Sequence, residues 1–117
     1  MKKRTYIIIG MVLILGLTVM GMQASATSPR FMKLSYEPQT ETLKVIILHF
    51  SPLRSEHYVY KVDVEKNGNL VASQLYTNQP RFFFYSYTYS VNATTGDELT
   101  VTAFCNLFGK LTRSITV

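Results

Sequence analysis

Apolar and polar residues alternate with a period of two along most of the chain after residue 27, and no useful length shows helical periodicity. Turn residues separate short runs rich in β-branched and aromatic side chains. The pattern predicts strands over residues 31–36, 43–50, 57–66, 70–77, 82–91, 99–105 and 111–117. About seven short strands without helices indicate an all-β Greek-key sandwich.

The individual runs carry more detailed expectations. The apolar run 43–50 suits a central strand buried on both faces, and Asn67-Gly68 is a preferred pair for a type I′ hairpin turn because both central residues need positive φ. In the third strand the residues that share one face are Tyr58, Tyr60, Val62 and Val64. In the fifth strand they are Phe83, Tyr85, Tyr87, Tyr89 and Val91.

The N-terminus has the layout of a secretory signal. Lys2, Lys3 and Arg4 form a positive region, residues 7–22 are apolar, and Ala24-Ser25-Ala26 is a small-residue cleavage site. We therefore expect a signal-peptide helix in residues 1–26, cleavage after Ala26, and a secreted domain over residues 27–117. The alternative is an uncleaved membrane anchor, although 16 apolar residues fall short of the about 20 that span a bilayer.

Composition narrows the partners of the predicted mature domain. Three of the 12 Lys and Arg residues lie in the signal, so the predicted mature domain has nine Lys and Arg residues and seven Asp and Glu residues, a net charge of +2. The basic residues are scattered, which argues against nucleic-acid binding. A membrane contact is expected only through an uncleaved N-terminal segment, and a homo-oligomer or a cell-surface partner stays open. Asn92-Ala93-Thr94 is a glycosylation sequon at a turn, with Asn92 as the acceptor.

Candidate chemistry rests on few residues. His49 and His57 flank one connection between strands, and Cys105 ends another strand, so the three side chains can meet at one end of a sandwich. Cys105 is the sole cysteine and has no internal disulfide partner, which leaves a free thiol, an intermolecular bridge or a metal ligand. The sequence contains no G-x-S-x-G elbow, CxxC, HExxH or Gly-rich phosphate loop.

Two segments resemble the superoxide reductases, the family of neelaredoxin and of the iron-binding domain of desulfoferrodoxin. Ser55-Glu56-His57-Tyr58-Val59 is similar to the family's E-H-(H/Y)-I segment, and Cys105-Asn106-Leu107-Phe108-Gly109 is similar to its C-N-x-H-G loop. The order along the chain also agrees, and the resemblance covers roughly residues 42–117.

The resemblance implies an immunoglobulin-like sandwich with a non-haem ferrous centre that reduces superoxide to peroxide. The family binds iron through four equatorial histidines and an axial cysteine thiolate. His57 matches the histidine after Glu, Cys105 matches the axial cysteine, and His49 is a match for the upstream histidine. Phe108 stands where the family places another histidine, so at most three of five ligands remain. Together with the predicted signal, the resemblance therefore implies an exported member with a degenerate or altered iron site.

Other functions stay open at this stage. An extracellular immunoglobulin-like binding or structural module would use the sandwich alone, with the aromatic strand 82–89 as a stacking surface for a glycan or protein. A copper protein would need a histidine and a methionine after the cysteine, and residues 106–117 contain neither. A zinc site with one cysteine and two histidines remains formally available.

Overall fold

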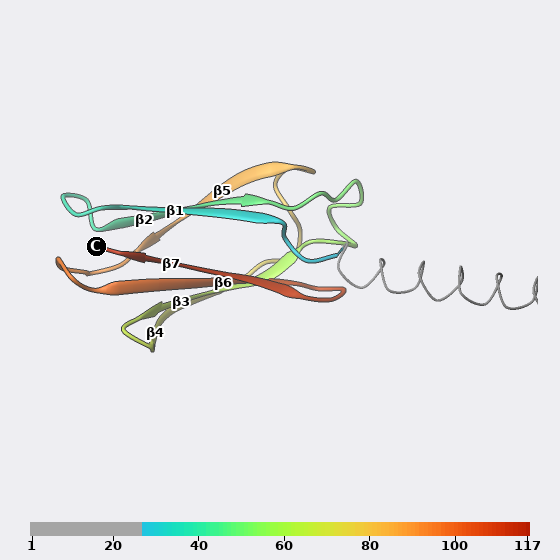
Figure 1. The fold of residues 1–117 in the computed structure, drawn as a ribbon. Helices are drawn as coiled ribbons and strands as arrows, with labels where there is room; N and C mark the ends of the chain where they lie inside the picture. Colours follow the sequence, from blue (N-terminus) through green and yellow to red (C-terminus); the bar gives the residue numbers. More distant parts are fainter. Residues whose placement is uncertain (1–26) are drawn as a thin grey trace, which may run out of the picture.

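Seven antiparallel strands form two facing sheets, as Figure 1 shows. The structure is a computed structural model that describes residues 27–117, and the predicted signal helix, cleavage site and alternative anchor fall outside the described residues. The strands are β1 Phe31–Glu37, β2 Thr42–Leu48, β3 Val59–Lys66, β4 Asn69–Leu75, β5 Phe84–Ser90, β6 Glu98–Cys105 and β7 Lys110–Thr116. The prediction of an all-β sandwich of about seven strands is confirmed.

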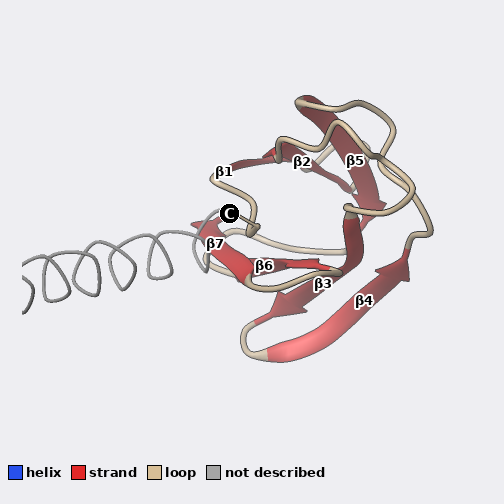
Figure 2. Cartoon of the chain, turned by 90° about the vertical axis from the view of Figure 1, so that its right-hand side faces the viewer, coloured by secondary structure: helices blue, strands red, loops and turns tan. Residues whose placement is uncertain are grey.

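The first sheet has the strand order β1-β2-β5, and the second has β4-β3-β6-β7. The chain passes from one sheet to the other after β2, after β4 and after β5. Figure 2 shows the two sheets and the loops that connect them. In constant immunoglobulin domains the fourth strand joins the first sheet, whereas β4 here lies beside β3. Within residues 27–117 there is no helix able to cross a membrane.

The inward faces of both sheets supply the core. The fully buried side chains come from alternate positions of β2, β3 and β6, as expected for strands with one face toward a second sheet. They include Leu43, Val45, Ile47, Val59, Val62, Val64, Leu99, Val101 and Ala103. The seven described strands and this core lie within residues 27–117, the range predicted for the mature domain.

The predicted turn is confirmed, and the predicted face of the fifth strand is confirmed except at Phe83. Asn67 and Gly68 both have positive φ, 52° and 82°, in the two-residue turn between β3 and β4. In the fifth strand Tyr85 is buried and Tyr87 and Tyr89 pack against the core, so the tyrosine face points inward, whereas Phe83 precedes β5 and is 46% exposed. Within the aromatic segment 82–89, the exposed large hydrophobic residues are therefore Phe82, Phe83 and Phe84.

The expectation for the run 43–50 is only half right. Its odd-numbered positions are buried, but Lys44 and Phe50 are exposed and Ile46 and Leu48 are half-buried. β2 is central in its sheet, yet among the described residues no layer covers the sheet's outer face. The apolar run therefore reflects strand propensity as well as burial.

The predicted face of β3 is wrong at its beginning. Val62 and Val64 are buried as expected, but Val59 is also fully buried, whereas Tyr58 and Tyr60 are half-exposed. The cause is a β-bulge, because Val59 pairs with Cys105 and Lys61 with Phe104, which leaves Tyr60 as the extra residue. The bulge changes which alternate residues face the core.

Candidate metal centre

His49, His57 and Cys105 come together at one end of the sandwich. His49 directly follows β2 and continues the inward series of Val45 and Ile47. Cys105 ends β6 and continues its inward series in the same way. Alternation along two strands, one in each sheet, thus brings an imidazole and a thiol to the same interior.

The bulge at Tyr60 brings the second histidine to this interior. Without it, the inward series of Val62 and Val64 would continue through Tyr60 and leave the odd-numbered residues on the outer face. With it, Val59 and His57 take the inward positions, and His57 lies half-buried beside His49. A local irregularity of β3 therefore positions this candidate ligand.

The three side chains are close enough to share one ion. One ligand atom from each lies within 4.8 Å of the others, and the two imidazole rings meet edge-to-face with centroids 4.6 Å apart. Two ligands on opposite sides of a metal are about 4.4 Å apart, since metal–sulfur and metal–nitrogen bonds are about 2.3 and 2.1 Å, so small movements of these side chains would bring all three to one ion. His49 is 1% exposed and Cys105 is 5% exposed, so the centre is largely shielded from water.

Gln79 fixes the orientation of His49. Its amide nitrogen donates to the backbone carbonyls of His49 (2.7 Å) and Arg81 (2.9 Å), so its Oε1 must be the acceptor for His49 Nδ1 at 2.6 Å. Nδ1 therefore carries a proton, which leaves Nε2 as the nitrogen available to a metal. Metal-binding histidines commonly have such a partner on the second nitrogen.

Tyr85 supports the same amide from the core. Its hydroxyl donates to Gln79 Oε1 at 3.3 Å. Burial raises the pKa of Tyr85 well above that of a free phenol, and neighbouring Tyr87 adds to the shift. The hydroxyl consequently remains protonated and able to donate throughout the ordinary pH range.

The backbone carbonyl of Thr27 also enters the centre. Its oxygen is 2.7 Å from His49 Nε2 and 3.3 Å from His57 Nε2. Because Nδ1 of His49 already holds a proton, a lone pair on Nε2 would face the carbonyl oxygen. Such a contact is favourable only with a second proton or a cation beside both atoms.

Asn106 joins the two segments that the family resemblance singled out. Its Oδ1 accepts from the backbone N–H of Tyr58 (2.8 Å), and its Nδ2 donates to the carbonyl of Glu56 (2.9 Å). The backbone N–H of Asn106 also donates to the carbonyl of Tyr58 at 3.0 Å. The Cys-Asn pair thus holds the His57 segment at a fixed distance from the thiol.

Phe108 does not fill the centre. Its side chain is 62% exposed, and its carbonyl accepts a hydrogen bond from Thr27 Oγ1 at 2.7 Å. The loop closes through Gly109, whose carbonyl accepts from Cys105 N–H at 3.0 Å and whose φ is +87°. A Cβ at Gly109 would lie 2.8 Å from Ser28 Cβ, so the first described residues pack directly on the cysteine loop.

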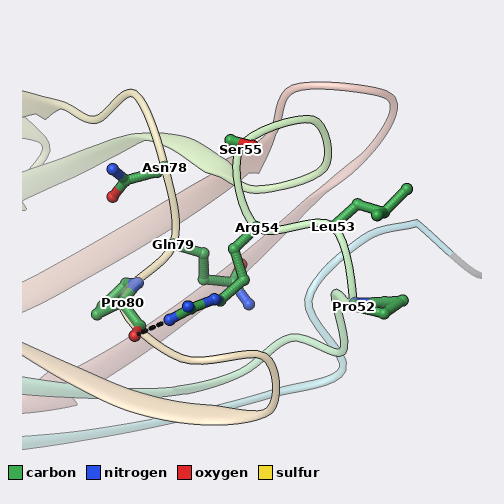
Figure 3. Close-up of a pocket in the computed structure, with 7 residues that line it drawn as sticks. All are labelled: Pro52, Leu53, Arg54, Ser55, Asn78, Gln79 and Pro80. Carbon is green, nitrogen blue, oxygen red and sulfur yellow. Dashed lines mark hydrogen bonds between the residues drawn. The ribbon is translucent and has the colours of Figure 1, made fainter.

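A separate open pocket of about 530 Å³ lies between the loops that follow β2 and β4. Figure 3 shows its lining, with Arg54 donating to the carbonyl of Pro80 across the two loops. Gln79 contributes to this wall while its amide reaches His49 on the other side. The candidate ligands themselves do not line this pocket.

The donor set fits a transition metal held by two imidazoles and one thiolate, a combination suited to iron, zinc or copper. It does not supply the five ligands of the superoxide reductase family, since the chain has two histidines. Asn92, the candidate glycosylation site, is exposed just after β5, and its modification stays a prediction.

The positions of the three convergent side chains follow from the strand pattern of the sequence, whereas two other contributors to the centre, Gln79 and Thr27, do not. Gln79 lies in an irregular loop between β4 and β5, where no periodicity marks it as buried. Thr27 acts through its backbone, which residue identity does not reveal. The one hint in the sequence was the predicted cleavage after Ala26, which makes Thr27 the first residue of the mature chain.

Comparisons with known proteins give a limited match. No family model matches the sequence, and no curated protein sequence matches it. The structure is similar to a hypothetical protein from Pyrococcus horikoshii, with 15% identity, a TM-score of 0.48, and coverage of 76% of this chain and 88% of the other. It is also similar to a superoxide reductase (neelaredoxin) from Ignicoccus hospitalis, with 13% identity, a TM-score of 0.46, and coverage of 76% and 81%.

Proposed function

We propose that this protein is an exported metal-binding domain of the superoxide reductase-like type, with an altered centre formed by His49, His57 and Cys105. The observation that carries the proposal is the convergence of their ligand atoms within 4.8 Å inside a shielded end of the sandwich. The sequence resemblance supports iron as the metal. Superoxide reduction with this reduced ligand set is an outcome to be measured.

The chain's own residues have distinct parts in this proposal. Cys105 supplies the thiolate, and Gln79 holds the His49 ring so that Nε2 faces the ion. Asn106 keeps the His57 segment against the cysteine loop. A bound iron would supply one-electron redox chemistry, with the thiolate raising electron density at the metal.

The test is anaerobic loading of the purified protein with ferrous iron, followed by oxidation and absorption spectroscopy. We expect one iron per chain and a thiolate-to-iron charge-transfer band that is absent in Cys105→Ser. Zinc and copper are offered in parallel, and superoxide consumption is measured on the loaded protein. Failure to bind any of the three metals stoichiometrically would contradict the proposal.

A binding module without a metal is the second candidate, and one surface favours it. Phe82, Phe83 and Phe84 are exposed at the start of β5, and Phe83 contacts Phe50 and Phe84 edge-to-face at 6.1 and 5.5 Å. Exposed aromatic groups of this kind mark sites for protein or glycan contact. A metal-free protein that loses partner binding on Phe83→Ser would support this second function.

A further inference from the structure

We infer that the α-amino group of Thr27, released by signal cleavage, is a ligand of the same metal together with the Thr27 carbonyl oxygen. The inference rests on the proposed metal-binding function and on cleavage after Ala26. It makes export a step in assembly of the centre, because the precursor lacks this amine.

The position of the Thr27 carbonyl carries the first step. Neighbouring ligands around one ion, each about 2.1 Å from it, lie roughly 3.0–3.4 Å from one another. The Thr27 oxygen is 2.7 Å from His49 Nε2 and 3.3 Å from His57 Nε2. The distance to His57 falls within this range and the distance to His49 is about 0.3 Å below it, so a small movement of the carbonyl would bring its oxygen to the position of a fourth ligand.

Thr27 is also held in this position by contacts on the other side. Its hydroxyl donates to the Phe108 carbonyl at 2.7 Å, and Ser28 packs against Gly109. Arg30 N–H then pairs with the Leu48 carbonyl at 2.9 Å, which fixes the segment as it enters β1. These contacts place the segment over the centre at a defined depth.

Chemistry distinguishes the mature N-terminus from the precursor. A peptide nitrogen shares its lone pair with the carbonyl group and is a poor metal donor, whereas a terminal amine has a free lone pair. The amine and carbonyl of one residue close a five-membered chelate consisting of N, Cα, C, O and the ion. Two donors from Thr27 would then replace ligands that the chain lacks, including the one lost at Phe108.

The test compares proteins that differ by one residue at a terminus. The first begins at Thr27, the second begins at Ala26, and the third begins at Thr27 with one alanine added after Val117. Val117 lies at the opposite end of the sandwich, so the third protein controls for chain length (Figure 1). Each binds ferrous iron anaerobically in competition with a chelator, and labelling with ¹⁵N-threonine followed by oxidation allows pulsed EPR.

We expect the Ala26-extended protein to bind iron at least about tenfold more weakly than the other two. Loss of a residue that supports a metal ligand typically lowers metal affinity about 10–100-fold, and we take the lower end of that range. A ¹⁵N hyperfine coupling from Thr27 should be present only in the proteins that begin at Thr27. Equal affinities, with the Cys105-dependent band retained, would overturn this inference and leave the metal function intact. No metal binding by any of the three would overturn both.

The exported protein provides an independent check. Mass spectrometry of the protein recovered outside the producing cells should give Thr27 as the first residue. A different first residue, or full retention of residues 1–26, would overturn the inference without affecting the role of Cys105.

Discussion

Gln79 is the residue on which the orientation of His49 depends, and replacing it tests the site directly. Gln79→Leu keeps the approximate volume but removes four hydrogen bonds, two to the His49 ring and backbone, one to Arg81 and one to Tyr85. The side chain is 2% exposed, so water does not replace these partners easily. The substitution should therefore affect both the fold and the candidate metal centre.

The expected loss of stability follows from the partners left behind. A hydrogen bond contributes about 0.5–1.5 kcal/mol net, and a buried group left unpaired costs about 1–3 kcal/mol. With three short bonds and one long one, we expect Gln79→Leu to lower the free energy of unfolding of the metal-free protein by about 2–4 kcal/mol. That is a large share of the about 5–15 kcal/mol of an ordinary domain.

Metal affinity provides the second readout. Loss of a group that orients a ligating histidine typically weakens metal binding about 10–100-fold. Gln79→Glu separates the two effects, because its carboxylate still accepts from His49 Nδ1 but cannot donate to the two carbonyls. We expect Gln79→Glu to lose stability as Gln79→Leu does, while retaining more metal affinity.

The measurements are urea unfolding of the metal-free proteins and iron competition titrations under conditions where every variant is folded. Gln74→Leu is the matched control, because Gln74 is exposed on β4 and donates only to the neighbouring Leu75 carbonyl. It should change stability by less than about 0.5 kcal/mol. Unchanged iron affinity in folded Gln79→Leu would refute the role assigned to the amide.

Three other predictions follow from contacts around the centre. Asn106→Ala removes both side-chain bonds to the segment with the second histidine, and should lower iron affinity at least about tenfold in competition titrations. Gly109→Ala forces a side chain into positive φ and against Ser28, so urea unfolding should show a loss of about 1–3 kcal/mol. Burial raises the pKa of Tyr76 and Tyr89, so the unfolded state loses its phenolic protons at a lower pH than the folded state. The free energy of unfolding should therefore fall as the pH rises past about 10, and absorbance at 295 nm reports the ionisation of the tyrosines. Tyr89→Phe should reduce this fall in stability.

Sequence patterning predicts this fold well because most of its information is local. Alternation identified all seven strands, and Asn67-Gly68 predicted its turn because the turn requires positive φ at both positions. The convergence of His49, His57 and Cys105 followed from their places at strand ends, and the structure brings them together. Metal ligation itself stays a prediction.

The features that patterning missed all depend on long-range pairing. The bulge at Tyr60 is a feature of the pairing between β3 and β6, two strands that are far apart in the sequence, so the local sequence does not reveal it. Gln79 is buried because its loop folds onto the segment that follows β2, where its side chain contacts the ring and the carbonyl of His49. A glutamine in an irregular loop usually remains in solvent, so composition alone gives no reason to expect it inside.

The placement of the candidate ligands also bears on how so small a domain holds together. His49 belongs to the β1-β2-β5 sheet, whereas Cys105 and the approach to His57 belong to the other sheet, so one ion would join both layers. Antibody domains place an inter-sheet disulfide between their second and sixth strands, whereas this chain has one cysteine and cannot form an internal disulfide. A metal present at 100 times its Kd stabilises the folded state by about 2.7 kcal/mol, similar to a disulfide. Metal binding at this end of the sandwich would therefore serve the fold as well as any chemistry at the ion.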